Sequence, residues 1–268
     1  MTYKEKARKA RKKVLQLIYK AGTSHIGSNL SCAEMLTVLF DHFDFKKDKF
    51  VAGKSWAAAS VYYQLRRRGR ITQKELDSFC QPGSKYLGLV EPGKDIPFGI
   101  GSMGFALSAA CGFAWSKLQR KQKGTVYVLE SDGGFHEGST WEALMFAAHH
   151  KLKNLVCILD ANRFSAMGPT RETLNQDYLA CSLSSMGWDV DTVDGHDSKA
   201  IEAALLKTSN APRLIIANTV KGKGVSRFEG NNLYHYKQLD YNEYAEAIAE
   251  LGDPELYKKN LRALRKAI

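Results

Sequence analysis

Several features that would argue against a soluble globular protein are absent from the sequence. No apolar run approaches the roughly 20 residues that a helix needs to span a bilayer, so we expect no membrane partner. The first twenty residues contain no signal-peptide core and no small-residue cleavage site. Internal repeats, low-complexity tracts and obvious linkers are also missing. With 44% hydrophobic and 25% charged residues among 268, the chain can bury a large core, and its length does not demand two domains.

Paired cysteines are missing as well. The chain has five cysteines, an odd number, and they are scattered without a CxxC pair. Buried free thiols in a reducing compartment are the simplest interpretation. We therefore expect a cytoplasmic protein. The five are Cys32, Cys80, Cys111, Cys157 and Cys181.

Acidic residues are in the minority, with 28 Asp and Glu against 39 Lys and Arg and a formal charge of +11. The basic residues are dispersed and no nucleic-acid-binding motif accompanies them, so nucleic acid is not the expected partner. Positive charge also suits phosphorylated ligands or an acidic partner subunit. The densest basic cluster, residues 4–13, is best explained as a solvated helix face.

Short β-rich runs alternate with longer helical segments. We expect strands at residues 125–130, 155–160, 189–194 and 213–220, and helices at 104–118, 139–151, 171–186, 198–208, 243–251 and 254–266. The second and fourth strands are nearly continuously apolar, as parallel strands buried on both faces are. The alternation predicts an α/β fold, a doubly wound three-layer α/β/α sandwich with a mostly parallel sheet. We expect one domain over residues 1–268, with helical N- and C-terminal extensions.

Polar, glycine-rich segments follow the expected strands directly, where ligands bind in such sheets. Asp132 and Gly133 follow the first strand, and Asn162 closes the second. Asp132 and Asn162 should therefore meet at the carboxyl ends of neighbouring strands. A carboxylate and an amide oxygen suit Mg²⁺, which commonly completes its shell with phosphate oxygens. Gly133 would let the backbone approach a diphosphate, although a lone Asp-Gly pair is usually only a turn.

In their order and spacing, the motifs of this chain resemble the N-terminal half of transketolases, which binds thiamine diphosphate, and especially the split form made of two subunits. The resemblance covers most of the chain. The motifs are His25-Ile-Gly-Ser28, Gly101-Ser-Met-Gly104, Asp132-Gly133, Glu137-Gly138, Trp141-Glu-Ala143, Asp160-Ala-Asn162, Asp194-Gly-His196, Lys221-Gly-Lys-Gly-Val225 and the segment from Asn231 to His235.

The resemblance implies thiamine diphosphate and Mg²⁺ as cofactors. The metal would be bound by the side chains of Asp132 and Asn162 and by the backbone oxygen of Phe164. The residues expected to contact thiamine diphosphate are Gly101, Ser102, Met103, Asp132, Gly133, Asn162 and His235.

The resemblance also implies two catalytic histidines and an interface carboxylate. His25 and His235 would face the substrate or diphosphate end of the cleft. Glu137 matches a carboxylate that the family places near the subunit interface, where it couples paired active sites. A structural role for His25 at a helix end, and a role for Glu137 at a helix N-terminus, are the alternatives.

The activity that the resemblance implies is transfer of a two-carbon ketol unit from a ketose-type donor to an aldehyde or keto acceptor. In this family the residue that activates the cofactor lies on the pyrimidine-binding domain. The chain should therefore be inactive alone and should work with a C-terminal, pyrimidine-binding subunit in an α2β2 assembly.

Two positions depart from the family pattern near the expected substrate channel. Trp56 and, in a looser alignment, Leu89 stand where transketolases usually carry histidines. Because the metal ligands are retained, these changes predict an altered donor or acceptor, a sugar or a keto compound. Trp56 is either a packed core residue or a wall of a reshaped channel.

Other interpretations stay open. An acyloin-forming or decarboxylating carboligase would use a 2-keto acid donor. A non-catalytic binding or regulatory subunit would keep the fold, with or without the cofactor. The segment 221–224 suits either an anion or a solvated basic turn. His196 falls in a loop to which the sequence assigns no role.

Overall fold

The computed structural model describes residues 1–99 and 101–252, so the expected helix at 254–266 lies outside the described residues. In chain order the elements are α1 (Tyr3–Ala21), α2 (Ile26–Ser31), α3 (Ala33–His42), β1 (Lys49–Ala52), η1 (Ser55–Ala57), α4 (Ala58–Arg67), α5 (Gln73–Asp77), β2 (Phe98–Gly99), α6 (Phe105–Gln119), β3 (Val126–Ser131), η2 (Asp132–His136), α7 (Gly138–His149), β4 (Leu155–Ala161), α8 (Thr170–Thr173), α9 (Leu179–Ser185), β5 (Asp189–Asp194), α10 (Ser198–Leu206), β6 (Arg213–Asn218), η3 (Asn232–His235) and α11 (Tyr241–Gly252). Within the described ranges, no helix combines the length and the hydrophobicity needed to cross a bilayer.

The strands form one sheet in the order β2-β1-β3-β4-β6-β5, and every neighbouring pair is parallel. All seven residues of β4 are buried, as its apolar sequence predicts for a central parallel strand. The four expected strands are confirmed to within two residues at each end. The sequence analysis missed β1 and β2, which have only four and two residues.

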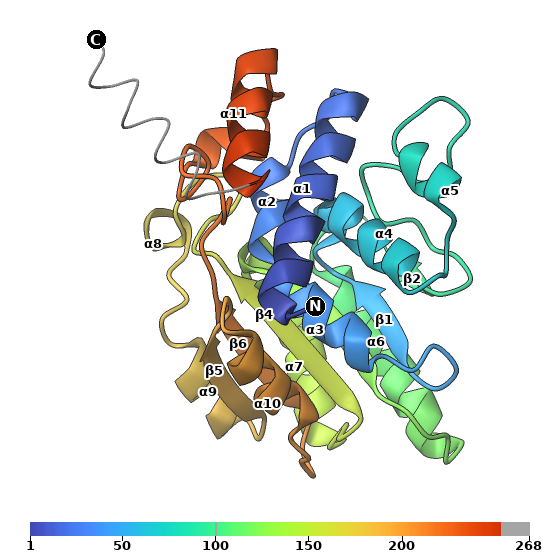
Figure 1. Cartoon of the computed structure of the whole chain (residues 1–268). Coiled ribbons are helices and arrows are strands. Elements are labelled where there is room, and N and C mark those ends of the chain that lie inside the picture. Colours follow the sequence, from blue (N-terminus) through green and yellow to red (C-terminus); the bar gives the residue numbers. More distant parts are fainter. Residues whose placement is uncertain (100, 253–268) are drawn as a thin grey trace.

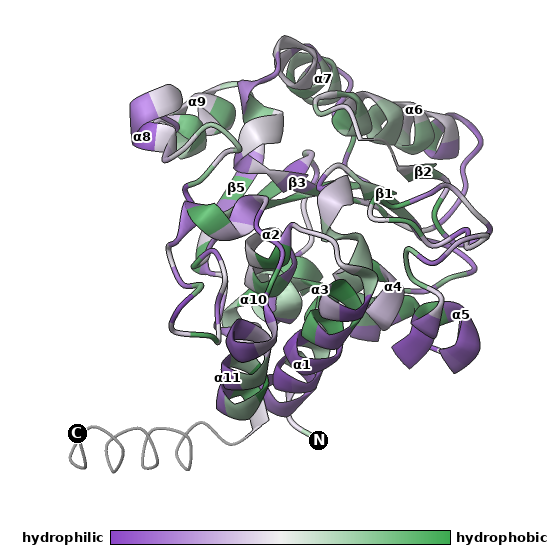
Figure 2. Ribbon diagram, turned by 90° about the horizontal axis from the view of Figure 1, so that it is seen from above, coloured by the Kyte–Doolittle hydropathy of each residue, from purple (hydrophilic) through white to green (hydrophobic). Residues whose placement is uncertain are grey.

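Helices cover both faces of the sheet, which confirms the three-layer prediction. In β3, Val128 packs into a cluster with α6, α7 and α9, whereas Leu129 packs into a cluster with α1, α3, α4 and α10. Cys157 and Ile158 of β4 divide in the same way, because successive strand side chains point to opposite faces. Figure 2 shows these two groups of helices on opposite sides of the strands, and α11 lies beside α1 in both views (Figures 1 and 2).

The helix expected at residues 171–186 is wrong as one element. The structure divides it into α8 and α9, and Leu174 between them has an extended backbone. In this interruption the buried Gln176 donates from Nε2 to the backbone oxygen of Asp132 at 2.7 Å. A continuous helix would have to give up this bond, so a tertiary contact overrides local helix propensity here.

Candidate active site

The predicted meeting of Asp132 and Asn162 is supported by the strand pairing. Ser131, the last residue of β3, is paired with Asp160 of β4, so Asp132 and Asn162 leave the same edge of the sheet. The backbone N–H of Arg163 donates to Asp132 Oδ2 at 2.9 Å, and the N–H of Phe164 donates to Asn162 Oδ1 at 3.1 Å. The loop after β4 therefore wraps onto the carboxylate that ends β3.

One oxygen of this carboxylate has no partner. Asp132 is fully buried, and its Oδ1 makes no hydrogen bond to any described residue. Burial, reinforced by the nearby Asp160, raises the pKa of Asp132 to about 7. A cation would satisfy Oδ1 and would favour the ionised carboxylate. Because the described residues contain no group of three His, Cys, Asp or Glu side chains that could hold a metal, the other ligands would be amide, backbone and phosphate oxygens, a set typical of Mg²⁺.

A cavity of about 210 Å³ opens beside this edge of the sheet. Its lining consists of His25, Ser28, Gly53, Lys54, Trp56, Gly101, Met103, Ser131, Gly133, Asn162, Phe164, Ser165, Ala166, His235 and Tyr236.

Most of the predicted site residues line this cavity, but three do not. Asp132 is buried next to its floor, one residue from Gly133. Ser102 is exposed outside the lining. Glu137 is at the N-cap of α7 and packs against Gly104, where an added Cβ would lie 2.6 Å from the Glu137 Cβ.

The cavity contains a buried lysine that the sequence analysis missed. Lys54 follows β1 and forms a buried ion pair with Asp160, whose carboxylate also accepts hydrogen bonds from Ser31 and Thr219. Burial acts to lower the pKa of Lys54, but the Asp160 carboxylate outweighs it and holds the pKa above its usual value. Since β1 itself was not recognised, no local signal marked Lys54 as part of the site.

A second lysine corrects the basic-turn interpretation of residues 221–224. Lys221 is only 1% exposed, and its Nζ lies 2.6 Å from Asn232 Oδ1 and 2.9 Å from His235 Nδ1. Burial, together with repulsion from Lys54, lowers the pKa of Lys221 to about 7. Lys54 is already paired with Asp160, whereas the Nζ of Lys221 contacts the neutral Asn232 and His235, so a phosphate group near Lys221 would offset its charge.

The two predicted histidines lie together and are neutral. The backbone N–H of His25 donates to the backbone oxygen of His235 at 2.9 Å, and the centroids of the two rings are 5.0 Å apart. Burial, with repulsion from Lys221, lowers the pKa of His25 to about 4 and that of His235 to about 3. When Lys221 is protonated it can only donate, so His235 Nδ1 then accepts and the ring proton is on Nε2.

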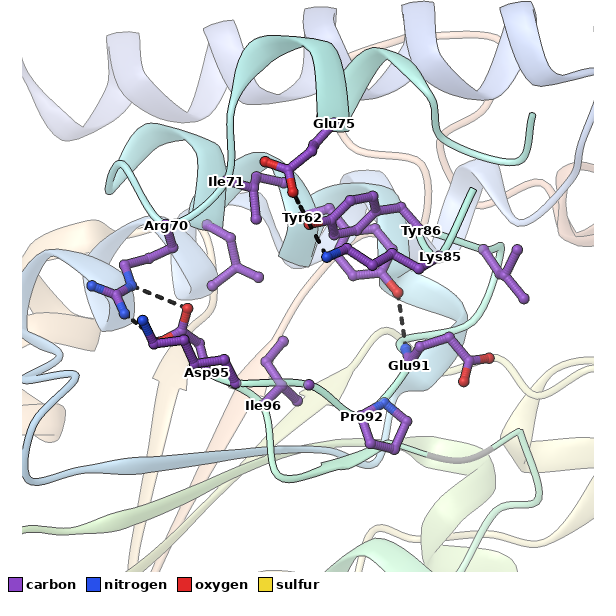
Figure 3. Close-up of a pocket in the computed structure, with 14 residues that line it drawn as sticks. Tyr62, Arg70, Ile71, Glu75, Lys85, Tyr86, Glu91, Pro92, Asp95 and Ile96 are labelled. Atoms are coloured by element: carbon purple, nitrogen blue, oxygen red, sulfur yellow. Dashed lines mark hydrogen bonds and ion pairs between the residues drawn. The ribbon is translucent and has the colours of Figure 1, made fainter. Parts of the chain in front are cut away.

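Of the two departures from the family pattern, one lines the cavity and the other packs against a lining residue. Trp56 is 38% exposed and lines the cavity, so its interpretation as a packed core residue is wrong. A Cβ on Gly101 would lie 2.9 Å from Leu89 Cδ1, so Leu89 packs beside the expected ring site. The hydroxyl of Tyr62 donates to the Leu89 backbone oxygen and accepts from the N–H of Glu91, each at 2.9 Å. Figure 3 shows the Tyr62–Glu91 bond in a separate pocket of about 450 Å³ that the same segment borders.

Comparison with known protein families identifies the family of the chain. Residues 3–258 match the family described as transketolase, thiamine diphosphate binding domain. The chain belongs to the transketolase family. Among solved structures, transketolase from Campylobacter jejuni is similar with a TM-score of 0.86 and 26% identity, over 94% of this chain and 43% of that protein.

Transketolase relatives of two lengths are similar to the chain. One of the subunits of an apulose-4-phosphate transketolase from Phocaeicola vulgatus is 32% identical over 97% of this chain and 98% of its own length. The 6-deoxy-6-sulfo-D-fructose transketolase subunit SqwG of a Clostridium species is 30% identical over 90% and 93%. Human transketolase is 33% identical over 97% of this chain, which spans only 44% of the human protein.

Proposed function

We propose that this chain is the thiamine-diphosphate- and Mg²⁺-binding subunit of a split transketolase-like enzyme. The enzyme transfers a two-carbon ketol unit from a ketose-type donor to an aldehyde or keto acceptor. The observation that carries the proposal is the buried Asp132 Oδ1, which lacks a partner among the described residues at the strand edge that Asn162 shares.

The residues around the cavity divide into three sets by what they would hold. Asp132, Asn162 and the backbone oxygen of Phe164 would bind Mg²⁺. A Cβ on Gly133 would lie only 3.0 Å from Met103. Because Gly133 has none, it would let the diphosphate approach the backbone. Gly101, Ser102 and Met103 would contact the rings of the cofactor. Lys221 and Lys54 would offset the charge of the diphosphate.

The cofactor, when bound, supplies a carbon nucleophile for the donor carbonyl. The chain's own contribution to the chemistry lies in its histidines. As neutral rings, His25 and His235 can each donate or accept a hydrogen bond at a substrate oxygen without adding a third cation beside the two lysines. The proton on His235 Nε2, set by Lys221 at Nδ1, makes that nitrogen a donor.

A partner subunit that carries the pyrimidine-binding domain completes the proposal, in an α2β2 assembly. Large apolar side chains support it, because Phe105, Met145 and Phe146 of α6 and α7 are between 40% and 54% exposed. Figure 2 shows these two helices as predominantly hydrophobic on the outer side of the sheet. Exposed apolar surface of this kind marks protein contacts. Glu137, at the start of α7, would lie close to the same contact.

Calorimetry on the chain mixed with its pyrimidine-domain partner tests the proposal. Thiamine diphosphate is titrated in the presence of Mg²⁺ and in the presence of EDTA, with the chain alone as the control. We expect tight, metal-dependent binding to the complex only. A well-formed complex that binds no cofactor would overturn the proposal and leave a non-catalytic regulatory role as the alternative.

Donor assays separate ketol transfer from the remaining enzyme alternative. Ketose phosphates and 2-keto acids are offered to the complex with an aldehyde acceptor, and CO₂ is measured. Turnover of a ketose phosphate without CO₂ supports ketol transfer. Turnover restricted to 2-keto acids that carry no hydroxyl group on carbon 3, with one CO₂ released for each product formed, would identify a decarboxylating carboligase instead.

A further inference from the structure

An aromatic cluster surrounds His25 at the rim of the cavity. Trp56 stacks on the His25 ring with a centroid distance of 4.3 Å and an interplanar angle of 11°. Tyr236 meets the same ring edge-on at 5.6 Å and 81°. Trp56 and Tyr236 both line the cavity and are 38% and 63% exposed. The rim therefore presents aromatic carbon where a substrate would enter.

The cluster is held by its backbone and its polar neighbours. His25 has a left-handed φ of 66°, and its backbone N–H donates to the backbone oxygen of His235. Its Nδ1 lies 2.8 Å from Ser24 Oγ, and the backbone oxygen of Trp56 accepts from Asn29 Nδ2 at 2.9 Å. Only Nε2 of His25 is left for a ligand. These contacts fix the His25 ring and the backbone of Trp56, and stacking on that ring positions the indole as a wall of the rim.

Such a wall recognises carbon better than oxygen. An indole has one N–H donor at its edge and no acceptor, and its face packs against C–H groups. A substrate hydroxyl placed on that face would lose its water partner and gain none, whereas a methyl or methylene group would bury apolar surface. A site of this kind discriminates modestly, by about 10–100-fold, between a methyl group and a hydroxyl of the same size.

We propose that Trp56, with Tyr236, makes this cavity select acceptors in which the carbon beside the reacting carbonyl carries no hydroxyl group. Trp56 is then the specificity-determining residue of the acceptor end of the site. This inference rests on the proposed function, since it names the class of compound that the ketol-transfer site accepts.

Two aldehydes of equal size test the inference. Propanal and glycolaldehyde differ only in a methyl group against a hydroxyl on the carbon next to the aldehyde. The complex with its partner subunit is given hydroxypyruvate as donor, which loses CO₂ as its ketol unit is transferred, and kcat/KM is measured for each acceptor. The wild type is compared with Trp56→His, which brings a hydrogen-bonding ring, and with Trp56→Phe, which keeps an aromatic face.

We expect the wild type and Trp56→Phe to use propanal at least as well as glycolaldehyde. Trp56→His should shift the ratio of kcat/KM values towards glycolaldehyde by about tenfold or more. A wild-type preference for glycolaldehyde of 100-fold order, or a ratio that stays within about twofold in Trp56→His, would overturn the inference. An equal shift in Trp56→Phe would also overturn it, because bulk and not hydrogen bonding would then be the cause.

Cofactor binding separates this inference from the function on which it rests. Each variant complex is first titrated with thiamine diphosphate and Mg²⁺. Binding without the expected acceptor preference defeats the inference and leaves the proposed function intact. Absence of binding in the wild-type complex defeats the proposed function, and the inference falls with it.

Discussion

The backbone N–H of Arg163 donates to Oδ2 of Asp132 at 2.9 Å and leaves Oδ1 of the same carboxylate without a described partner. One oxygen is therefore used to shape the loop after β4, and the other is free to bind a ligand. The chain orients this side chain before any ligand arrives, which reduces the reorganisation that binding requires.

Asp132→Asn should separate these two uses. The amide oxygen of Asn can still accept from Arg163, so the fold is kept, but the charge that attracts a cation is lost. Changes next to a metal ligand weaken binding by about 10–100-fold, so loss of a direct charged ligand should weaken Mg²⁺-dependent cofactor binding by about 100-fold. Isothermal titration of the complex measures this. Asp177→Asn is the matched control, because Asp177 is exposed and its only ion pair among the described residues is with the side chain of Arg163.

Lys221→Met should weaken diphosphate binding and change its pH dependence. A buried charge-assisted bond contributes about 1.5–3 kcal/mol, so the dissociation constant should rise by about 10–150-fold. In the wild type the free Lys221 has a pKa of about 7, and an anion raises it. Affinity is then full below pH 7 and falls as the pH rises, by at most tenfold per unit.

The control for this prediction is Lys223→Met, which removes a lysine two positions away that is partly exposed and pairs with Glu229. Because the diphosphate also titrates, the informative quantity is the difference between the pH profiles of wild type and variant. Parallel profiles for wild type and Lys221→Met would show that Lys221 does not contact the anion.

Charged residues on the exposed apolar faces of α6 and α7 should prevent assembly with the partner. Met145→Glu places a carboxylate where the side chain is 54% exposed, so the isolated chain should fold normally. Central interface residues commonly contribute 2 kcal/mol or more, which corresponds to about 30-fold weaker association. Leu206→Glu is the control, since Leu206 is 57% exposed on α10, on the other face of the sheet. Sedimentation velocity that shows unchanged assembly of Met145→Glu would remove this face from the interface.

The central sheet and the sheet edge that Asp132 and Asn162 share could be predicted because both depend on local patterns. Apolar runs predict β4 and β6. The position directly after a strand predicts Asp132, which follows β3, and Asn162, which follows β4. Parallel strands bring those two together without further information. The same reasoning did not predict β1, because a strand of four residues is too short to recognise from its pattern. Lys54, which follows β1, was therefore not predicted as a site residue.

What the sequence could not provide is the effect of burial on individual side chains. Lys221 is in a glycine-rich basic segment whose local pattern indicates a solvated turn, yet packing against Gly27 and His235 buries it. His196 had no assigned role, but it lies 3.1 Å from Glu34 and its Nε2 accepts from the N–H of Val220 at 2.9 Å. Tertiary contacts such as the one between His196 and Glu34 leave no trace in local composition.

Glu130, in β3, presents a further case in which burial decides the outcome. It is 1% exposed, and neither carboxylate oxygen has a hydrogen-bond partner among the described residues. Burial raises its pKa to about 8. The carboxyl group fits only because two neighbours are glycines, since a Cβ on Gly53 would lie 2.2 Å from Oε1 and one on Gly134 would lie 2.4 Å from Oε2.

Glu130 and Gly53 should therefore be coupled in stability. Gly53→Ala should destabilise the chain by about 1–3 kcal/mol, because the buried carboxyl group cannot move away from the added methyl. Glu130→Leu should stabilise it by about 1–3 kcal/mol, because an unpaired buried polar group is replaced by a shorter apolar one. In the double variant the added methyl group at position 53 gains the vacated space, so the loss caused by Gly53→Ala should largely disappear. Urea denaturation of the four proteins gives the coupling energy directly. Additive effects of the two changes would mean that the Glu130 side chain does not occupy the space beside Gly53.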